Sequence, residues 1–84
     1  MGEEEVWGLE EKARRVLQAA AVEAHGSARA YVIGERVMGR ANITDLEEFR
    51  VVAQYLEGMG WIAEGDADYG VFVLTVEGIK EATD

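Results

Sequence analysis

Residues 44–62, TDLEEFRVVAQYLEGMGWI, decide the fold of this 84-residue chain. Thr44 and Glu47 have the spacing of a capping box, in which two side chains satisfy free amides at the start of a helix. Apolar residues then recur with the helical period, and two glycines interrupt the pattern before an apolar segment begins at Trp61. We therefore predict a helix over residues 44–58, capped by Thr44 and followed by a β-strand. The predicted buried stripe of this helix consists of Leu46, Phe49, Val52, Ala53 and Leu56.

Two further helices are predicted before this segment. Residues 3–24 carry an alanine-rich apolar stripe, and Gly26 is expected to end that helix in the left-handed conformation at the C′ position. A second, shorter helix is predicted over residues 28–38, with Gly39 as its end. A short turn then leads into the third helix. The residues of the second helix that are expected to face inward are Ala30, Tyr31, Gly34, Val37 and Met38.

After the third helix the pattern changes to that of β-strands. Residues 61–64 and 71–75 are rich in aromatic and β-branched side chains, and residues 65–70 between them are dense in turn-forming types. These segments predict a β-hairpin, and Thr75 is expected to cap a short helix over residues 76–84. The helices and the hairpin are expected to share one core. Its predicted centre is formed by Leu17, Val37, Phe49 and Leu56, with Phe72 and Leu74 from the hairpin.

The composition indicates one small domain, residues 1–84, with apolar residues making up 49% of the chain. The chain contains no cysteine, which excludes disulfides, thiolate metal sites and cysteine nucleophiles. No apolar run approaches the roughly 20 residues of a membrane span. The acidic start, MGEEEVWG, lacks the apolar part of a signal peptide, so we expect a cytoplasmic protein that does not enter a membrane. The net charge of −9 disfavours binding to nucleic acid unless basic residues cluster locally.

The order of the predicted elements resembles that of the winged helix-turn-helix family, over about residues 9–82. Three passages carry the resemblance: residues 31–60, which place a turn between two helices, YLEGMGWIAE at 55–64, and VLTVEGIKEA at 73–82. The resemblance implies an α+β fold with a three-helix core, a β-hairpin called the wing, and a short C-terminal helix. It also implies a DNA-binding transcription regulator of the bacterial or archaeal type, whose helix over residues 44–58 enters the major groove.

By that resemblance, the outward face of helix 44–58 is expected to contact DNA. Gln54 has a side chain that pairs with adenine, and Arg50 has one that binds guanine or a phosphate. Three other arginines are expected to gather along the second helix and its turn, where they would bind phosphates. The full set of predicted nucleic-acid or partner contacts is Arg29, Arg36, Arg40, Glu47, Arg50, Val51 and Gln54.

The charges support a second interpretation, a winged-helix module that binds protein and not nucleic acid. The predicted wing carries Glu64, Asp66 and Asp68 but no lysine or arginine, whereas wings that grip a DNA backbone usually carry a basic residue. The arginines would then only balance neighbouring carboxylates on a solvated surface. The apolar residues expected to form the contact patch in this interpretation are Val32, Ile33, Val51 and Tyr55.

A third interpretation is a domain that serves only for homodimerisation. Trp7 lies off the apolar stripe of the first helix, and exposed large aromatic residues often mark interfaces. In the DNA-binding interpretation we also expect a homodimer, in which Trp7 and the alanine-rich first helix make the contact. The simpler alternative is a Trp7 that lies over the edge of its own domain.

No pattern predicts an enzyme or a bound cofactor. His25 is the only histidine and lies at a predicted helix end, where it suits the helix dipole. Ser27 has no predicted acid or oxyanion hole to complete a catalytic group. Asp66 and Asp68 have a spacing found in calcium loops, but the rest of that pattern is absent. We therefore predict no catalytic, cofactor-binding or metal-binding residues.

Overall fold

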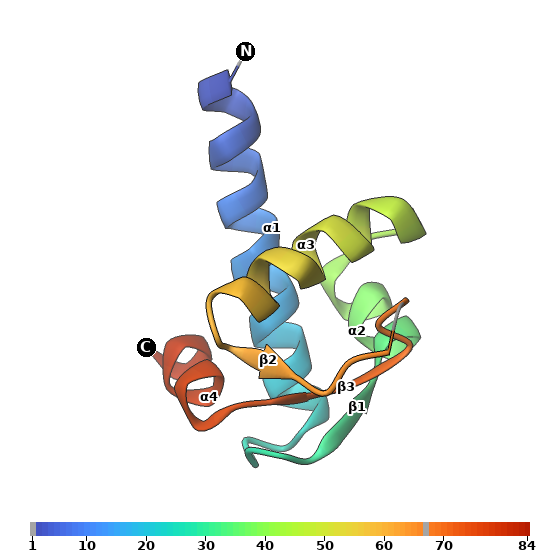
Figure 1. Ribbon diagram of the computed structural model, residues 1–84, viewed down its shortest axis with the longest axis vertical. Helices are drawn as coiled ribbons and strands as arrows, with labels where there is room; N and C mark the ends of the chain where they lie inside the picture. The colour runs from blue at the N-terminus through green and yellow to red at the C-terminus, as the bar shows by residue number, and fades with distance from the viewer. Residues whose placement is uncertain (1, 67) are drawn as a thin grey trace.

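The computed structural model describes the backbone of residues 2–66 and 68–84 and the side chains of residues 8–66 and 68–84. Within these residues, four helices and a three-stranded antiparallel sheet form a small α+β fold, which confirms the predicted class (Figure 1). In chain order the elements are α1 (Gly2–Glu23), β1 (Tyr31–Ile33), α2 (Gly34–Ala41), α3 (Leu46–Gly58), β2 (Ile62–Ala63), β3 (Val71–Leu74) and α4 (Val76–Thr83).

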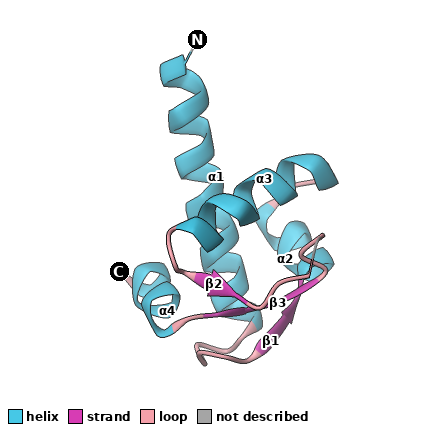
Figure 2. Cartoon of the chain, in the orientation of Figure 1, coloured by secondary structure: helices cyan, strands magenta, loops and turns pink. Residues whose placement is uncertain are grey.

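The sheet has the strand order β1-β3-β2, so β3 is the central strand (Figure 2). β2 and β3 pair in antiparallel register, with Ile62 opposite Leu74, and this pairing confirms the predicted hairpin. β1 lies along the other edge of β3, with Val32 opposite Phe72. These four side chains lie on one face of the sheet because partners and alternate residues share a face. All four are buried, so this face covers the core.

The segment predicted as one helix over residues 28–38 divides into the strand β1 and the start of α2, so that prediction is wrong. The side chains of β1 alternate as strand residues do. Val32, expected to be exposed, is buried, whereas Tyr31, expected to face inward, is exposed over 68% of its surface. The physical reason is the pairing with β3, a partner distant in sequence that helical periodicity does not register.

The predicted centre of the core is confirmed. Leu17 of α1, Val37 of α2 and Phe49 of α3 are almost fully buried, as are Leu56 and Phe72. The ring centroids of Phe49 and Phe72 lie 6.3 Å apart with the planes tilted by 44°, so the core joins α3 to the central strand. Burial of one such side chain contributes about 1.5–3 kcal/mol. That is a large part of the net stability of a domain, about 5–15 kcal/mol.

Helix α1 ends in a motif in which a residue of positive φ follows the helix and two amides bond back to its last turn. That residue is His25, with a φ of 54°. The amides of His25 and Gly26 donate to the carbonyls of Val22 and Ala21, at 3.0 and 2.9 Å. The prediction that Gly26 occupies this position is therefore wrong by one residue. His25 does lie at the helix end, as expected.

The next two helices end in the same way. In α2 the residue of positive φ is Asn42, at 60°, and not the predicted Gly39, which lies inside the helix. In α3 it is Gly60, at 78°, one of the two glycines that interrupt the helical pattern in the sequence. Asparagine adopts this conformation more readily than other residues with a side chain, so Asn42 can end α2 without a glycine.

The residue that caps the start of α3 also differs from the prediction. Asp45, and not Thr44, caps α3, because its carboxylate accepts a 3.1 Å bond from the amide of Glu47. Both residue types are favoured at this position, so the sequence pattern fits either. Leu46 is consequently the first helical residue and is half exposed, although it was expected in the buried stripe. Thr75 caps α4 as predicted, accepting a 3.0 Å bond from an amide in its first turn.

Two glycines allow helices to touch the backbone of other segments. A Cβ atom on Gly34 would lie 2.1 Å from the carbonyl oxygen of Tyr69, and one on Gly78 would lie 2.0 Å from that of Trp61. Both distances are too short for any side chain, so these positions require glycine. The contacts hold α2 against the loop between β2 and β3, and α4 against the segment that follows α3.

Helix α1 runs along the length of the molecule, and its N-terminal half extends past the other elements (Figure 1). In the part of the chain that the structure describes, no helix has both the length and the apolar character needed to cross a membrane.

Candidate interaction surfaces

The outward face of α3 carries the residues that were expected to contact a partner. Glu47, Val51 and Gln54 are exposed on the side of the helix opposite the buried Phe49 and Val52. Their side chains follow each other at helical spacing, so they form one row along the solvent side. The predicted geometry of this row is therefore confirmed, whereas its function stays a prediction.

Arg50 lies beside this row but is held by carboxylates. Its guanidinium group lies 3.3 Å from Oε1 of Glu47 and 3.7 Å from Oδ1 of Asp68. Nε of Arg50 is buried, and among the described residues it has no hydrogen-bond partner. The side chain thus links α3 to the loop between β2 and β3, and it is already engaged where a guanine or a phosphate would have to compete for it.

The loop over residues 64–70 is folded onto itself and presents carboxylates. Oδ1 of Asp66 accepts bonds from the amides of Asp68 and Gly70, at 3.2 and 2.8 Å, which is the pattern of a turn stabilised by its own side chain. Tyr69 points inward, is 5% exposed, and its hydroxyl donates a 2.7 Å bond to Oε1 of Glu57. Burial, followed by the hydrogen bond and charge of Glu57, raises the pKa of Tyr69.

Arg36 and Arg40 of α2 meet at one carboxylate of α1. Arg40 forms an ion pair with Oε2 of Glu23, and a terminal nitrogen of Arg36 lies 3.8 Å from Oε1. The hydrogen bond from Arg40 lowers the pKa of Glu23, against a smaller opposing effect of desolvation. The positive charges of Arg40, Arg36 and His25 lower it further. These arginines therefore tie α2 to the end of α1.

Arg29 does not share a helix with Arg36, which corrects the prediction that both lie on the second helix. It lies in the turn before β1 with a φ of 69°, and its amide donates a 2.9 Å bond to the carbonyl of Leu74. The structure thus brings together only two of the four predicted basic contacts, Arg36 and Arg40. Arg29 and Arg50 lie on other elements.

The charge balance of this region is negative. Residues 34–70, which contain α2, α3 and the loop before β3, carry three arginines and eight carboxylates. The acidic residues are Glu35, Asp45, Glu47, Glu48, Glu57, Glu64, Asp66 and Asp68. In residues 8–66 and 68–84, no group of three or more histidine, aspartate or glutamate side chains is arranged to hold a metal ion.

The outer face of the sheet is a second exposed surface, and it is apolar. Tyr31 and Ile33 of β1 and Val71 of β3 expose 68%, 50% and 41% of their surfaces. They share a face because Ile33 pairs with Val71, and Tyr31 pairs with Val73 two residues along the same strand. Ile33 was expected to be exposed, but the strand that groups it with Tyr31 was not. The signal that could have found it is the run Tyr31–Ile33, which is rich in β-forming residues.

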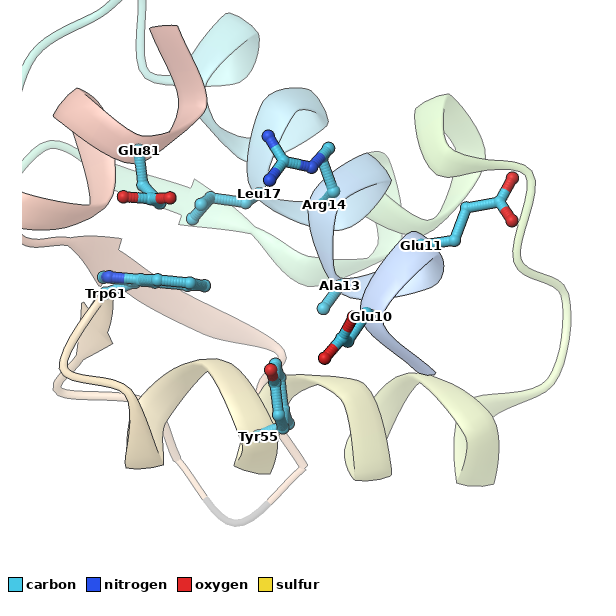
Figure 3. Close-up of a pocket in the computed structure, with 8 residues that line it drawn as sticks. All are labelled: Glu10, Glu11, Ala13, Arg14, Leu17, Tyr55, Trp61 and Glu81. Carbon is cyan, nitrogen blue, oxygen red and sulfur yellow. The ribbon is translucent and has the colours of Figure 1, made fainter. Parts of the chain in front are cut away.

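A groove lies where α1, α3 and α4 meet, with a cavity volume of about 590 Å³ (Figure 3). Trp61 and Tyr55 form two of its walls, and Leu17 contributes apolar surface from α1. Tyr55, expected in an outward patch on α3, faces this groove instead. The sequence gives no sign of the groove, because its lining comes from three helices and the segment after α3. The lining residues are Glu10, Glu11, Ala13, Arg14, Leu17, Tyr55, Trp61 and Glu81.

The predicted dimer contact at Trp7 lies outside the side chains that the structure describes, so it stays a prediction. Comparison of the chain with protein-family models, with curated proteins and with solved structures gives no significant match.

Proposed function

We propose that this protein is a winged-helix module that binds another protein through the outward face of α3 and the adjoining loop, and that it does not bind DNA there. Two features support the winged-helix assignment: α2 and α3 are joined by a short turn, and the β2–β3 hairpin follows α3 directly. The strand β1 fastens this hairpin to the helices, so that a wing would stand in a fixed position beside α3.

The charge balance of residues 34–70 is the observation that favours a protein partner over DNA. Eight carboxylates face three arginines in this region, and Arg36, Arg40 and Arg50 all lie within ion-pairing distance of carboxylates. Duplex DNA presents about one negative charge per 1.7 Å of its axis. Approach to that surface would bring carboxylates against phosphates and would require the arginines to leave their partners.

The same face suits a partner with a basic surface. Val51 is the apolar residue of the outward row, with 53% of its surface exposed, and Glu47 and Gln54 lie on either side of it. Asp68 and Glu57 add negative charge along the edge next to the loop. A partner would therefore place an apolar contact on Val51 within a ring of lysines or arginines, which favours correct orientation and fast association.

A pair of substitutions distinguishes the two functions because it should strengthen DNA binding and weaken binding to a basic protein surface. Val51→Lys and Gln54→Lys add two positive charges to the outward row without removing any hydrogen bond or ion pair found in the described residues. If the face binds DNA, the double variant gains phosphate contacts and binds more tightly. If it binds a basic protein surface, the double variant loses the partner.

The matched control lies on α1, where Gln18 and Val22 are the same residue types at a similar exposure. Gln18→Lys with Val22→Lys changes the net charge equally but leaves α3 intact. We expect wild type and both variants to show no binding to a mixed-sequence duplex in low-salt anisotropy titrations up to about 100 μM. In nuclease-treated cell extract, a partner held by wild type and the α1 control should be absent from the α3 variant.

DNA binding is the second candidate, and exposure of Gln54 on the outward row of a helix that follows a short turn favours it. Wild-type binding to the duplex, strengthened by Val51→Lys with Gln54→Lys and by lower salt, would establish this candidate and remove the first. Loss of the same extract protein from both double variants would also count against the first candidate, since it would show only a dependence on total charge.

A further inference from the structure

The groove between α1, α3 and α4 combines apolar walls with an acidic rim. The indole of Trp61 and the ring of Tyr55 bound it on two sides, and Leu17 and Ala13 contribute the α1 surface between them (Figure 3). Trp61 is only partly buried although its amide and carbonyl groups bond to the main chain of Leu56 and Thr75, because its ring faces this open space. A volume of about 590 Å³ falls within the range of small-molecule sites, roughly 300–1,000 Å³.

Two carboxylates point into the groove from opposite sides. In Figure 3, Glu10 of α1 and Glu81 of α4 both extend toward the space beside Trp61 and Tyr55, whereas Glu11 points away from it. Arg14 is the sole cation among the lining residues and lies on the rim next to Leu17. The described ion pairs include none of these four charged residues. The lining residues therefore carry three carboxylates and one guanidinium, so their net charge is negative.

From this geometry we propose that the groove binds a small organic cation with a flat apolar body. The body lies against Trp61 and Tyr55, where aromatic surface attracts both apolar groups and positive charge. The cationic group lies between Glu10 and Glu81. A neutral molecule of the same shape gains the apolar contact alone, and an anion is repelled by both carboxylates. This site is separate from the α3 row proposed to bind protein, and its occupancy does not depend on that proposal.

Three probes of matched shape test the charge preference: naphthylmethylamine, naphthylmethanol and naphthoate. Binding is followed by ¹⁵N–¹H NMR at the indole N–H of Trp61, which is the sole indole once Trp7 is replaced by Phe. We expect the amine to bind with a dissociation constant on the order of 1 mM, as its size allows. The alcohol should bind about fivefold more weakly, and naphthoate at least about tenfold more weakly than the amine.

Charge-neutralising variants test which residues set this preference. Glu10→Gln and Glu81→Gln should each weaken amine binding about threefold and leave alcohol binding unchanged. Glu77→Gln, an exposed residue of α4 outside the groove, is the matched control and should change neither. Arg14→Gln should act with the opposite sign and tighten amine binding about twofold.

Several results would overturn the proposal. One is the absence of any Trp61 shift with the amine up to about 20 mM, well above the expected dissociation constant. Another is an equal response to all three probes, which would show an apolar surface without charge selection. A third is a loss of amine binding in Glu81→Gln that is no larger than the loss in Glu77→Gln. That result would show that the carboxylate in the groove does not attract the cation. A Trp61 signal that shifts with protein concentration alone would mean that a second copy of the chain occupies the groove.

Discussion

The hydroxyl group of Tyr69 donates a 2.7 Å hydrogen bond to Oε1 of Glu57, and this bond joins the acidic loop to α3. Tyr69 reaches this position with a φ of 55° and is 5% exposed, whereas Glu64, Asp66 and Asp68 of the same loop are exposed. Together with the contact between Arg50 and Asp68, it holds the loop at a fixed place beside the outward row of α3. The loop and the outward row of α3 therefore keep a fixed arrangement, and together they form the proposed protein-binding face.

Replacement of Tyr69 by Phe should lower the free energy of unfolding by about 1–2 kcal/mol, because it removes the bond to Glu57 and keeps the buried ring. Urea denaturation followed by circular dichroism gives this value. Tyr31→Phe is the control, since Tyr31 is exposed on the outer face of the sheet and makes no hydrogen bond through its hydroxyl in the described residues. An equal effect of both substitutions would show that the Tyr69 bond contributes nothing.

The raised pKa of Tyr69 predicts how stability changes at alkaline pH. A raised folded-state pKa means that the neutral phenol is favoured in the folded protein. Its contribution is fully present below the unfolded tyrosine pKa of about 10 and is lost as the pH rises through the folded value. Absorbance titration should show one of the three tyrosines ionising above the others. In Tyr69→Phe that late step, and the associated part of the alkaline loss of stability, should both be absent.

The start of α3 gives a prediction that distinguishes two adjacent residues. Asp45→Ala should destabilise the protein by about 1 kcal/mol, because its carboxylate accepts the bond from the amide of Glu47. Thr44→Ala should change the unfolding free energy by less than about 0.5 kcal/mol, since Thr44 is exposed and is not the cap. Thermal or urea unfolding of the two variants decides between them. A larger effect at Thr44 would restore the capping position expected from the sequence.

Two glycines of α2 should respond to alanine in opposite directions. Gly34→Ala places a Cβ 2.1 Å from the carbonyl oxygen of Tyr69, and we expect a loss of about 1–3 kcal/mol from the resulting backbone shift. Gly39 has no atom within 4 Å of its Cβ position and lies inside the helix. Gly39→Ala should therefore raise stability by about 0.5–1 kcal/mol. A stabilising Gly34→Ala would contradict the close contact between α2 and the loop.

The pairing of Glu23 with Arg40 should appear as a pH-dependent coupling between α1 and α2. A double-mutant cycle with Glu23→Gln and Arg40→Gln should give a favourable interaction at neutral pH. Because the folded-state pKa of Glu23 is lowered, its contribution is present above the ordinary glutamate value of about 4.3 and is lost as the pH falls through the folded value. A coupling that persists unchanged under acid would show that it does not arise from the charge of Glu23.

The elements with strong local signals were predicted closely. The helix that contains Phe49, the hairpin and the Thr75 cap each depend on residues near one another in the chain, so their patterns are visible in the sequence. The strand β1 was not predicted because its three residues, Tyr31–Ile33, are too few to show the alternating pattern of a strand. Its β-forming residue types are a weak local signal, and the pairing with β3 decides that it is a strand.

The candidate surfaces were predicted less well than the fold, for a related reason. The outward row of α3 follows from helical spacing alone, and it lies where expected. The ion pairing of Arg40 and Arg50 does not follow from helical spacing, because their partners Glu23 and Asp68 lie on other elements. The groove beside Trp61 depends on how α1 and α4 are arranged around it, so no segment of the sequence indicates it.

The pairing of Val32 with Phe72 has a consequence for how the chain reaches its native state. The two residues are forty positions apart, and everything from α2 to the acidic loop lies inside the span they close. Contacts between residues close in sequence allow the helices to form early. The sheet forms only after Val32 and Phe72, which are distant in sequence, come together. Folding kinetics should accordingly be slower than those of a purely helical bundle of the same length, with closure of the central strand as the late event.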